Sequence, residues 1–347
     1  MKFLVAYDHF VRKEHYEELF ANYPEHELVT VSYGYEDRII MRDMFREVEL
    51  NGPDAVEIPQ AMYDEVVDAD VIITHLCPIP AKLIEKGKKL RAILTNRGGL
   101  ENIAVKAATE RNIPILNNPA HNANAVAEFT VGLMIAESRN LARSFFSVKH
   151  GEWRENYSNF GNIWEMRGKT VGLIGFSTIG RLTAEKLSSF GVKMLVTDPK
   201  CDPEDELVKR LGIKVVDLPT LMKESDYVSL HARAKGCFLT KDVLSLMKPT
   251  AIFINTARAY MVDYDALYEL LRDKKILGAA IDVFPIEPLP IDYPLLTLDN
   301  CTVTTHRAGD TVNAYSESPA MLMEDYSLYL GGKQPRFLVN PEVGMGR

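Results

Sequence analysis

A glycine-bounded turn between a strand pattern and a helix pattern limits the possible folds of this chain more than any other feature. The apolar run at 170–174 is followed by Gly175-Phe176-Ser177-Thr178-Ile179-Gly180, a Gly-x-Ser-x-x-Gly sequence that opens a helix. In a Rossmann turn the first glycine permits a tight bend and the last permits close packing of helix on strand, while free N–H groups hold a pyrophosphate. Ser177 replaces the usual second glycine, so its Cβ crowds the phosphate while its hydroxyl offers a hydrogen bond. The sequence therefore predicts a dinucleotide site at Gly175, Ser177, Thr178, Ile179 and Gly180.

Asp198 indicates which dinucleotide this turn accepts. It ends the next predicted strand, 193–197, and stands 18 residues after Gly180. A carboxylate at this point accepts hydrogen bonds from the ribose hydroxyls and repels a 2'-phosphate, so we expect NAD and not NADP as the cofactor. The alternative is that Asp198 only opens the turn before Pro199.

Strand patterns alternate with helical patterns on both sides of the turn, which indicates parallel sheets covered by helices. The predicted strands are 2–7, 27–32, 69–74, 91–95 and 113–116 in the first part, and 170–174, 193–197, 214–216, 227–230, 251–255, 277–282 and 302–304 in the second. A chain of 347 residues is about long enough for two domains. We predict an α/β protein with two doubly wound parallel-sheet domains.

Two long helical patterns bear on how these domains are connected and assembled. The pattern at 312–330 follows the last strand and suits the first domain better than a third one. We therefore expect a Rossmann NAD-binding domain, 119–308, inserted into a flavodoxin-like substrate-binding (catalytic) domain, 1–118 and 309–347. The helix predicted at 124–150 has a wide apolar stripe, so it is either a core element or a dimer interface. We expect a homodimer.

Charge and composition narrow the kinds of partner. The net charge is −8 and the basic residues are scattered, which argues against nucleic acid and acidic membranes as partners. No run approaches the roughly 18 apolar residues of a membrane span, and the first apolar run is too short for a signal peptide. Four widely spaced cysteines suggest neither a zinc site nor disulfides. We expect a soluble, cytoplasmic protein with a small-molecule partner and no metal.

Three charged residues follow predicted strands of the second domain and can meet at one sheet edge. Arg258 follows 251–255, Glu287 follows 277–282, and His306 follows 302–304. The carboxyl ends of strands line the ligand crevice of an open α/β sheet. Histidine is suited to acid/base work near neutral pH, a neighbouring glutamate fixes its tautomer and raises its pKa, and arginine offers a planar fork to a carboxylate or keto oxygen.

These residues and several motifs around them resemble one family, the D-isomer-specific 2-hydroxyacid dehydrogenases. The resemblance runs from about residue 90 to 310 and rests on Ala127-Glu128, the glycine turn with Asp198, Phe253 to Arg258, Ala280 to Phe284 with Glu287-Pro288, and Thr305-His306. It implies hydride transfer between NAD and C2 of a small D-2-hydroxy or 2-keto acid, with Arg258, Glu287 and His306 as catalytic residues.

The resemblance also suggests where cofactor and substrate bind. Further cofactor-binding positions are expected at His231, Ala232, Arg233, Thr256, Ala257, Asp282 and Gly309. The substrate carboxylate is expected on the turn of Arg97, Gly98 and Gly99, and His75 is a further substrate-side candidate because it follows a strand.

Two departures and one rival function remain open at this point. Ala259 and Tyr260 follow Arg258 where many members have two glycines, and His231-Ala232-Arg233 replaces the usual His-x-Pro. Arg233 either touches the nicotinamide side or is solvated, and Arg97 either reaches a phosphate or second carboxylate or is a surface residue. The rival is an NAD(H)-binding co-repressor that uses the same fold for partner recognition; the short termini favour an enzyme.

Overall fold

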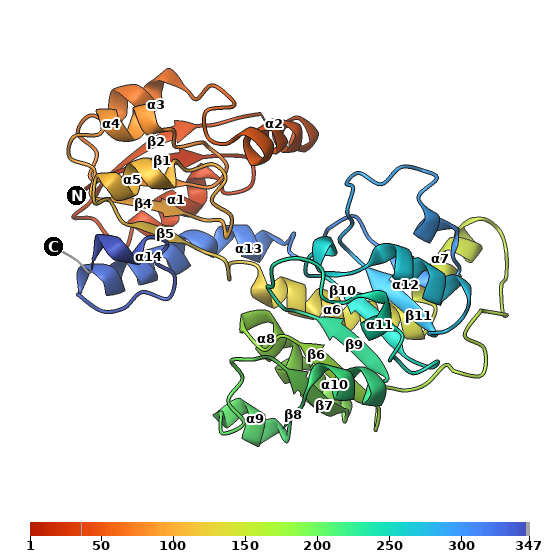
Figure 1. Cartoon of the computed structure of the whole chain (residues 1–347). Coiled ribbons are helices and arrows are strands. Elements are labelled where there is room, and N and C mark those ends of the chain that lie inside the picture. The colour runs from red at the N-terminus through yellow and green to blue at the C-terminus, as the bar shows by residue number, and fades with distance from the viewer. Residues whose placement is uncertain (36, 345–347) are drawn as a thin grey trace. The chain divides into compact units, whose positions relative to one another are not determined.

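The computed structural model describes residues 1–35 and 37–344, which form two compact units (Figure 1). Unit 1 comprises Met1–Asn122 and Thr311–Arg347, and unit 2 comprises Ala123–Asp310. Each unit contains one sheet in which all paired strands run parallel. The α/β class with two parallel-sheet domains is confirmed.

Unit 1 has a five-stranded sheet in the order β2-β1-β3-β4-β5. Its strands are β1 (Lys2–Tyr7), β2 (Glu27–Ser32), β3 (Val71–Thr74), β4 (Ala92–Thr95) and β5 (Ile115–Asn117). Its helices are α1 (Lys13–Phe20), α2 (Arg38–Asn51), α3 (Gln60–Glu65), α4 (Ala81–Lys86), α5 (Val105–Glu110), α13 (Val312–Ser316) and α14 (Ser318–Leu330), with a short 3-10 helix at Pro341–Val343. The C-terminal helices pack on this sheet, since α14 contacts α1 and β5.

Unit 2 has a seven-stranded sheet in the order β12-β11-β10-β9-β6-β7-β8. Its strands are β6 (Thr170–Ile174), β7 (Lys193–Thr197), β8 (Lys214–Val215), β9 (Tyr227–Leu230), β10 (Ile252–Asn255), β11 (Gly278–Ile281) and β12 (Cys301–Val303). Its helices are α6 (Ala123–Ser138), α7 (Leu141–Lys149), α8 (Thr178–Leu187), α9 (Glu206–Leu211), α10 (Leu218–Glu224), α11 (Lys241–Leu244) and α12 (Tyr264–Arg272), with 3-10 turns at Ser188–Phe190, Ala259–Met261 and Pro294–Thr297.

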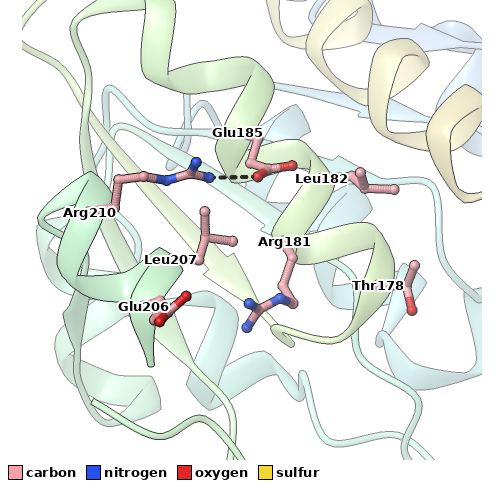
Figure 2. A pocket seen from close by; sticks show the side chains of 7 residues that line it. All are labelled: Thr178, Arg181, Leu182, Glu185, Glu206, Leu207 and Arg210. Carbon is pink, nitrogen blue, oxygen red and sulfur yellow. Dashed lines mark hydrogen bonds and ion pairs between the residues drawn. The ribbon is translucent and has the colours of Figure 1, made fainter. Parts of the chain in front are cut away.

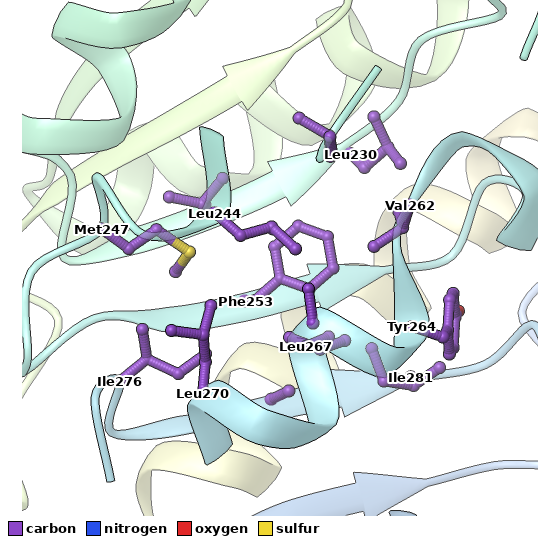
Figure 3. Close-up of a cluster of buried hydrophobic side chains, with 14 of the residues drawn as sticks. Leu230, Leu244, Met247, Phe253, Val262, Tyr264, Leu267, Leu270, Ile276 and Ile281 are labelled. Atoms are coloured by element: carbon purple, nitrogen blue, oxygen red, sulfur yellow. The ribbon is translucent and has the colours of Figure 1, made fainter. Parts of the chain in front are cut away.

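The strands are buried on both faces, as in other parallel sheets, and successive side chains enter different cores. In β10, Phe253 enters one cluster with Leu267 and Leu270 of α12, whereas Ile254 enters a cluster on the opposite face. Figure 3 shows Phe253 and Leu267 within the first of these clusters. The stiff sheet holds the loops at its carboxyl edge, where the predicted functional residues lie.

Each sheet has one point at which its strand order reverses. In unit 1 this point lies between β1 and β3, and in unit 2 it lies between β6 and β9. The loops after the two strands diverge there, so ligands of doubly wound sheets bind at such switch points. The turn at Gly175 follows β6, which places it at the switch point of unit 2.

Two long helices were predicted wrongly as continuous elements. The helix expected at 124–150 is interrupted at Asn140, which takes a left-handed backbone (φ 58°) between α6 and α7. The helix expected at 312–330 is divided into α13 and α14, and the second begins with a proline in its first turn. Apolar periodicity continues across both interruptions, so the pattern did not reveal them.

No helix in the described part of the chain is long and apolar enough to cross a membrane.

Candidate active site and cofactor turn

Glycine is required at both ends of the turn after β6. Gly175 has a φ of 96°, and a Cβ there would lie 2.6 Å from the backbone nitrogen of Ala232. A Cβ on Gly180 would lie 2.3 Å from the backbone oxygen of Gly175. Both distances are shorter than van der Waals contact, so the turn can form only without these side chains.

The N-terminus of α8 can accept an anion. Ser177 is its N-cap in an extended conformation, its hydroxyl makes no capping bond, and both Ser177 and Thr178 are exposed. Among the described residues, no acceptor is found for the backbone N–H groups of 177–180. Unpaired N–H groups and the positive end of a helix dipole suit a pyrophosphate.

Asp198 lies beside this turn at the end of β7. Its carboxylate accepts hydrogen bonds from the backbone N–H groups of Phe176 at 2.7 Å and Lys200 at 2.8 Å. The aspartate therefore ties the strand end to the glycine turn and still has lone pairs for ribose hydroxyls. These residues fit a dinucleotide with a free 2'-hydroxyl.

The other predicted cofactor positions surround the carboxyl ends of β9 and β10. His231 is buried, its Nε2 bonds Ser229 Oγ at 2.9 Å, and burial lowers its pKa to about 4. Arg233 is exposed, while Thr256 is buried with its hydroxyl 2.8 Å from that of Thr130 in α6. The His231 side chain is therefore an uncharged part of the wall at this edge.

Glu287 and His306 lie next to each other although 19 residues separate them in sequence. Glu287 Oε2 is 2.8 Å from Nδ1 of His306, and Glu287 Oε1 accepts the N–H of Phe284 at 2.8 Å. The His306 and Glu287 side chains are 49% and 36% exposed, so solvent reaches the pair. Because an ionised carboxylate only accepts, Nδ1 carries a hydrogen and Nε2 is left to exchange a proton with a ligand.

Asp282 shapes the turn that presents His306. His306 has a left-handed backbone with φ 54°, which a side chain rarely adopts. Asp282 is fully buried, and its carboxylate accepts the Thr304 hydroxyl at 2.6 Å and the N–H groups of Arg307 at 2.8 Å and Ala308 at 2.9 Å. From the sequence Asp282 was expected only to bind the cofactor, and these contacts were not predicted. Gly309 directly follows the same turn.

The electrostatics of the pair favour an ion pair. The hydrogen bond with Glu287 raises the pKa of His306 most, against burial and Arg258, and the negative charge of Asp282 adds to it. Burial alone would raise the pKa of Glu287, but bonds from His306 and Phe284 and the charge of Arg258 hold it below its ordinary value. The histidine is thus easier to protonate than a free imidazole.

Arg258 belongs to the same edge of unit 2. The turn before it is held by Asn255, whose side chain accepts the N–H of Ala257 at 3.0 Å and donates to Arg258 O at 3.3 Å. Arg258 is exposed, and its charge acts on both Glu287 and His306. Unit 2 therefore brings together the three residues predicted to be catalytic.

The predicted substrate residues belong to unit 1. A Cβ on Gly98 would lie 2.8 Å from Cα of Pro119, and Gly98 O accepts a hydrogen bond from the Asn117 side chain at 2.9 Å. Within the described ranges, the N–H groups of 98–100 have no acceptor. The glycines thus expose backbone donors of the kind that bind a carboxylate.

The side chain of Arg97 contacts helix α2. Its guanidinium lies 3.8 Å from the ring centroid of Phe45 and pairs with Glu49 at 3.5 Å and Glu101 at 3.8 Å. Burial lowers the pKa of Arg97, although both carboxylates oppose this. Among the described residues, Nε of Arg97 is buried without a hydrogen-bond partner, so these two ion pairs do not satisfy the whole guanidinium.

His75 has a partner that the sequence analysis missed. Its Nδ1 lies 2.9 Å from Oδ2 of Asp8, and both side chains are buried. Asp8 follows β1 as His75 follows β3, so the rule applied to Arg258 and His306 was sufficient to single it out.

A pocket of about 500 Å³ lies between α8 and α9 (Figure 2). Its lining residues are Thr178, Arg181, Leu182, Glu185, Glu206, Leu207 and Arg210. Arg181 pairs with Asp205 at 2.8 Å and Arg210 with Glu185 at 2.7 Å, and none of the predicted catalytic residues lines the pocket. We therefore do not place the chemistry there. In the part of the chain that the structure describes, no group of three or more His, Cys, Asp or Glu is arranged to hold a metal ion.

Comparison with known proteins gives related sequences and a related structure. The sequence model for the NAD-binding domain of D-isomer-specific 2-hydroxyacid dehydrogenases matches residues 131–308. A D-3-phosphoglycerate dehydrogenase of Methanocaldococcus jannaschii is 35% identical over 90% of this chain, and the chain spans only 60% of that relative's length. A hydroxypyruvate reductase of Thermotoga maritima is 38% identical over 77% of this chain and 86% of the relative.

The structural match concerns the fold. An NAD-complexed D-isomer-specific 2-hydroxyacid dehydrogenase from Lactobacillus delbrueckii ssp. bulgaricus matches with a TM-score of 0.77 at 23% identity. It covers 98% of this chain and 100% of its own.

Proposed function

We propose that this chain, which belongs to the D-isomer-specific 2-hydroxyacid dehydrogenase family and contains its NAD-binding domain, reduces a small 2-keto acid to a D-2-hydroxy acid. One observation carries the proposal: the 2.8 Å contact between His306 and Glu287, on both of which the charge of Arg258 acts. The names of the relatives are those of enzymes, which favours catalysis over a co-repressor role. Unit 1 takes the role of the substrate domain and unit 2 that of the NAD domain.

In this proposal His306 is the general acid in reduction and the general base in oxidation. During reduction Nε2 of protonated His306 donates to the keto oxygen, and during oxidation the neutral ring accepts the hydroxyl proton. Glu287 holds Nδ1 and stabilises the imidazolium, and Asp282 fixes the turn that carries the ring. A general acid placed this way typically contributes about 10²- to 10⁴-fold in rate.

The remaining residues hold the reactants. When bound, NADH supplies the hydride, and the residues that fit it are Gly175, the N–H groups of 177–180 and Asp198. The guanidinium of Arg258 is suited to a carboxylate or keto oxygen, and the N–H groups at Gly98 and Gly99 to the carboxylate.

We also propose that the protein is a homodimer of the cytoplasm. Large apolar side chains are exposed along α7 and the segment after it, including Phe145 (68%), Phe146 (64%), Trp153 (82%) and Phe160 (75%). Large apolar side chains exposed in this number suit an interface with a second copy of the chain. All four cysteines are free, as in proteins of a reducing compartment.

The test is a substrate panel with a matched pair of variants. Purified protein is mixed with NADH and glyoxylate, pyruvate, hydroxypyruvate or 3-phosphohydroxypyruvate while nicotinamide absorbance is followed. We expect turnover with at least one acid, and a fall in kcat of roughly 10²- to 10⁴-fold in His306→Ala. His15→Ala, on α1, is the control. No turnover with any 2-keto acid, or an unchanged kcat in His306→Ala, contradicts the proposal.

A further inference from the structure

A tyrosine hydroxyl is buried near the carboxyl ends of β10 and β11 in unit 2. Tyr264 is the first residue of α12 and is only 7% exposed, and Figure 3 shows its ring at the margin of the cluster that contains Phe253. The start of α12 is fixed by Asp263, whose carboxylate accepts the N–H of Ala266 at 2.9 Å. A phenol buried in this way needs hydrogen-bond partners, because an unpaired hydroxyl in an apolar core is costly.

The direction of each hydrogen bond at this hydroxyl is determined by its partners. The carbonyl oxygen of Val283 can only accept, so the Tyr264 hydroxyl donates its hydrogen there. Asn255, fully buried at the end of β10, donates its amide to the Tyr264 oxygen at 3.2 Å. The orientation of that amide is also fixed, because its Oδ1 accepts the N–H of Ala257 at 3.0 Å. The single hydrogen of the phenol therefore points to Val283.

The peptide group between Val283 and Phe284 connects this contact to Glu287. Its carbonyl accepts the Tyr264 hydroxyl, and its N–H donates to Oε1 of Glu287 at 2.8 Å. The carbonyl and the N–H belong to one plane, so holding the carbonyl also fixes the direction of the N–H. A hydrogen bond to the carbonyl polarises the amide as well, which strengthens its N–H as a donor. Tyr264 thus acts on the carboxylate through one peptide group.

The ring of Phe284 packs edge-on against two tyrosine rings. The ring centroids lie 6.4 Å apart for Tyr264 and 6.1 Å apart for Tyr293. Edge-to-face contacts of this kind depend on the ring and not on the hydroxyl. The ring of Tyr264 therefore contributes to packing, while its hydroxyl orients the peptide group, and a change to phenylalanine removes only the second contribution.

Glu287 depends on such an anchor because its side chain is partly exposed. The side chain is 36% exposed, and its Oε2 lies 2.8 Å from Nδ1 of His306. A carboxylate held at only one oxygen has more rotational freedom, and each departure from His306 weakens the hydrogen bond that raises the pKa of the histidine. The bond from Phe284 to Oε1 restrains the carboxylate and keeps Oε2 on the ring.

The charged groups around the pair stay in place when the hydroxyl is removed. The hydrogen bond with Glu287 raises the pKa of His306 most. The charge of Asp282 raises it further, and that of Arg258 lowers it. The titratable groups that act on the phenol are Glu287, Tyr293 and Cys301. Burial raises the pKa of the Tyr264 hydroxyl, so the phenol is uncharged, and a changed titration of His306 without it reports geometry and not a lost charge.

We propose that Tyr264 is a positioning residue for the acid/base pair of Glu287 and His306. Its hydroxyl, oriented by Asn255, holds the peptide group whose N–H anchors the glutamate. The same Asn255 amide donates to Arg258 O at 3.3 Å, so one buried group contacts both the phenol and the turn that carries the arginine. The proposal rests on the proposed function, because this pair is the one that exchanges a proton with the keto acid.

The experiment measures the pKa of His306 in Tyr264→Phe. Ring signals of the histidines are followed by NMR against pH, and the signal of His306 among the eight histidines is the one that is lost in His306→Ala. We expect the pKa of His306 to fall by roughly 0.5, as when one hydrogen bond of ordinary strength is lost. A merely structural role would lower the melting temperature and leave this pKa unchanged.

Two further variants assign the effect to the carboxylate. In Glu287→Gln the addition of Tyr264→Phe should cause no further fall in the pKa of His306, because the hydroxyl acts through the carboxylate. Tyr227→Phe is the control, since it also removes a buried tyrosine hydroxyl but from the cluster on the opposite face of the sheet, and it should leave this pKa unchanged.

The outcomes separate this proposal from the proposed function. An unchanged or raised pKa of His306 in Tyr264→Phe, an equal fall in Tyr227→Phe, or full additivity with Glu287→Gln overturns the positioning role. The NMR titration needs no turnover. A fall in the pKa together with no turnover of any 2-keto acid would contradict the proposed function and leave the positioning of Glu287 by Tyr264 intact.

Discussion

Replacing Gly180 by alanine tests whether the glycine turn binds the cofactor, because the added Cβ would be too close to the backbone of Gly175. The added Cβ would lie 2.3 Å from the backbone oxygen of Gly175, and a relaxed contact is about 3.5 Å, so α8 and the turn must separate by roughly 1 Å. A shift of this size removes at least one charge-assisted hydrogen bond to the pyrophosphate, worth about 1.5–3 kcal/mol. We therefore expect the Kd for NADH to rise roughly 10- to 100-fold.

The assay is a fluorescence titration with NADH, together with thermal unfolding of the same samples. Gly132→Ala is the control, because Gly132 is also helical, is exposed in α6 and has nothing within 4 Å of an added Cβ. That change should leave the Kd for NADH unchanged and stabilise the protein by about 0.5–1 kcal/mol. A Kd for Gly180→Ala within threefold of the unmodified protein, or an equal loss in Gly132→Ala, would refute the reasoning.

Three further predictions follow from single contacts. In Glu287→Gln the pKa of His306 falls, because the glutamate loses the negative charge that raises this pKa. In pH profiles of kcat/KM the plateau for reduction therefore ends at lower pH and oxidation begins at lower pH. Coincident profiles would mean that Glu287 does not act on His306. In Asp198→Asn the ribose hydroxyls lose a charged acceptor and a 2'-phosphate meets less repulsion. In parallel titrations the ratio of the Kd for NADPH to the Kd for NADH should therefore fall by roughly 10-fold or more. An unaltered ratio contradicts the assignment of Asp198. Phe253→Ala empties the centre of a fully buried cluster and lowers the free energy of unfolding by about 3–5 kcal/mol in urea titrations; a loss below about 1 kcal/mol would mean that the core is wrongly described.

Short-range sequence patterns were sufficient to predict those parts of the molecule that depend on residues close together in the chain. The turn from Gly175 to Gly180 and the strand ending at Asp198 are short-range patterns, and the alternation of strands and helices predicted the fold class. Glu287 and His306 were expected at one sheet edge because each follows a predicted strand, and in the structure these strands, β11 and β12, are neighbours. Their catalytic roles stay a prediction. The left-handed residue Asn140 was missed because the apolar pattern of the helix continues through it.

Contacts that depend on strand order were harder to predict. Asp8 and His75 are 67 residues apart, and they meet only because β1 and β3 are neighbours in the sheet. The role of Asp282 depends on three bonds to a turn more than 20 residues away. Such pairs require knowledge of which strands are adjacent, and one sequence without the structure does not contain it.

In the proposed reaction a hydride passes between the nicotinamide and C2 of a 2-keto acid while His306 supplies the proton. It is tested most directly by reducing hydroxypyruvate with NADH deuterated at the transferred position, then determining the deuterium content and configuration of the product. We expect one deuterium at C2 of the D-2-hydroxy acid. We also expect His306→Ala to form this product at a rate roughly 10²- to 10⁴-fold lower than the unmodified protein does. Product without deuterium at C2, or of L configuration, would contradict it.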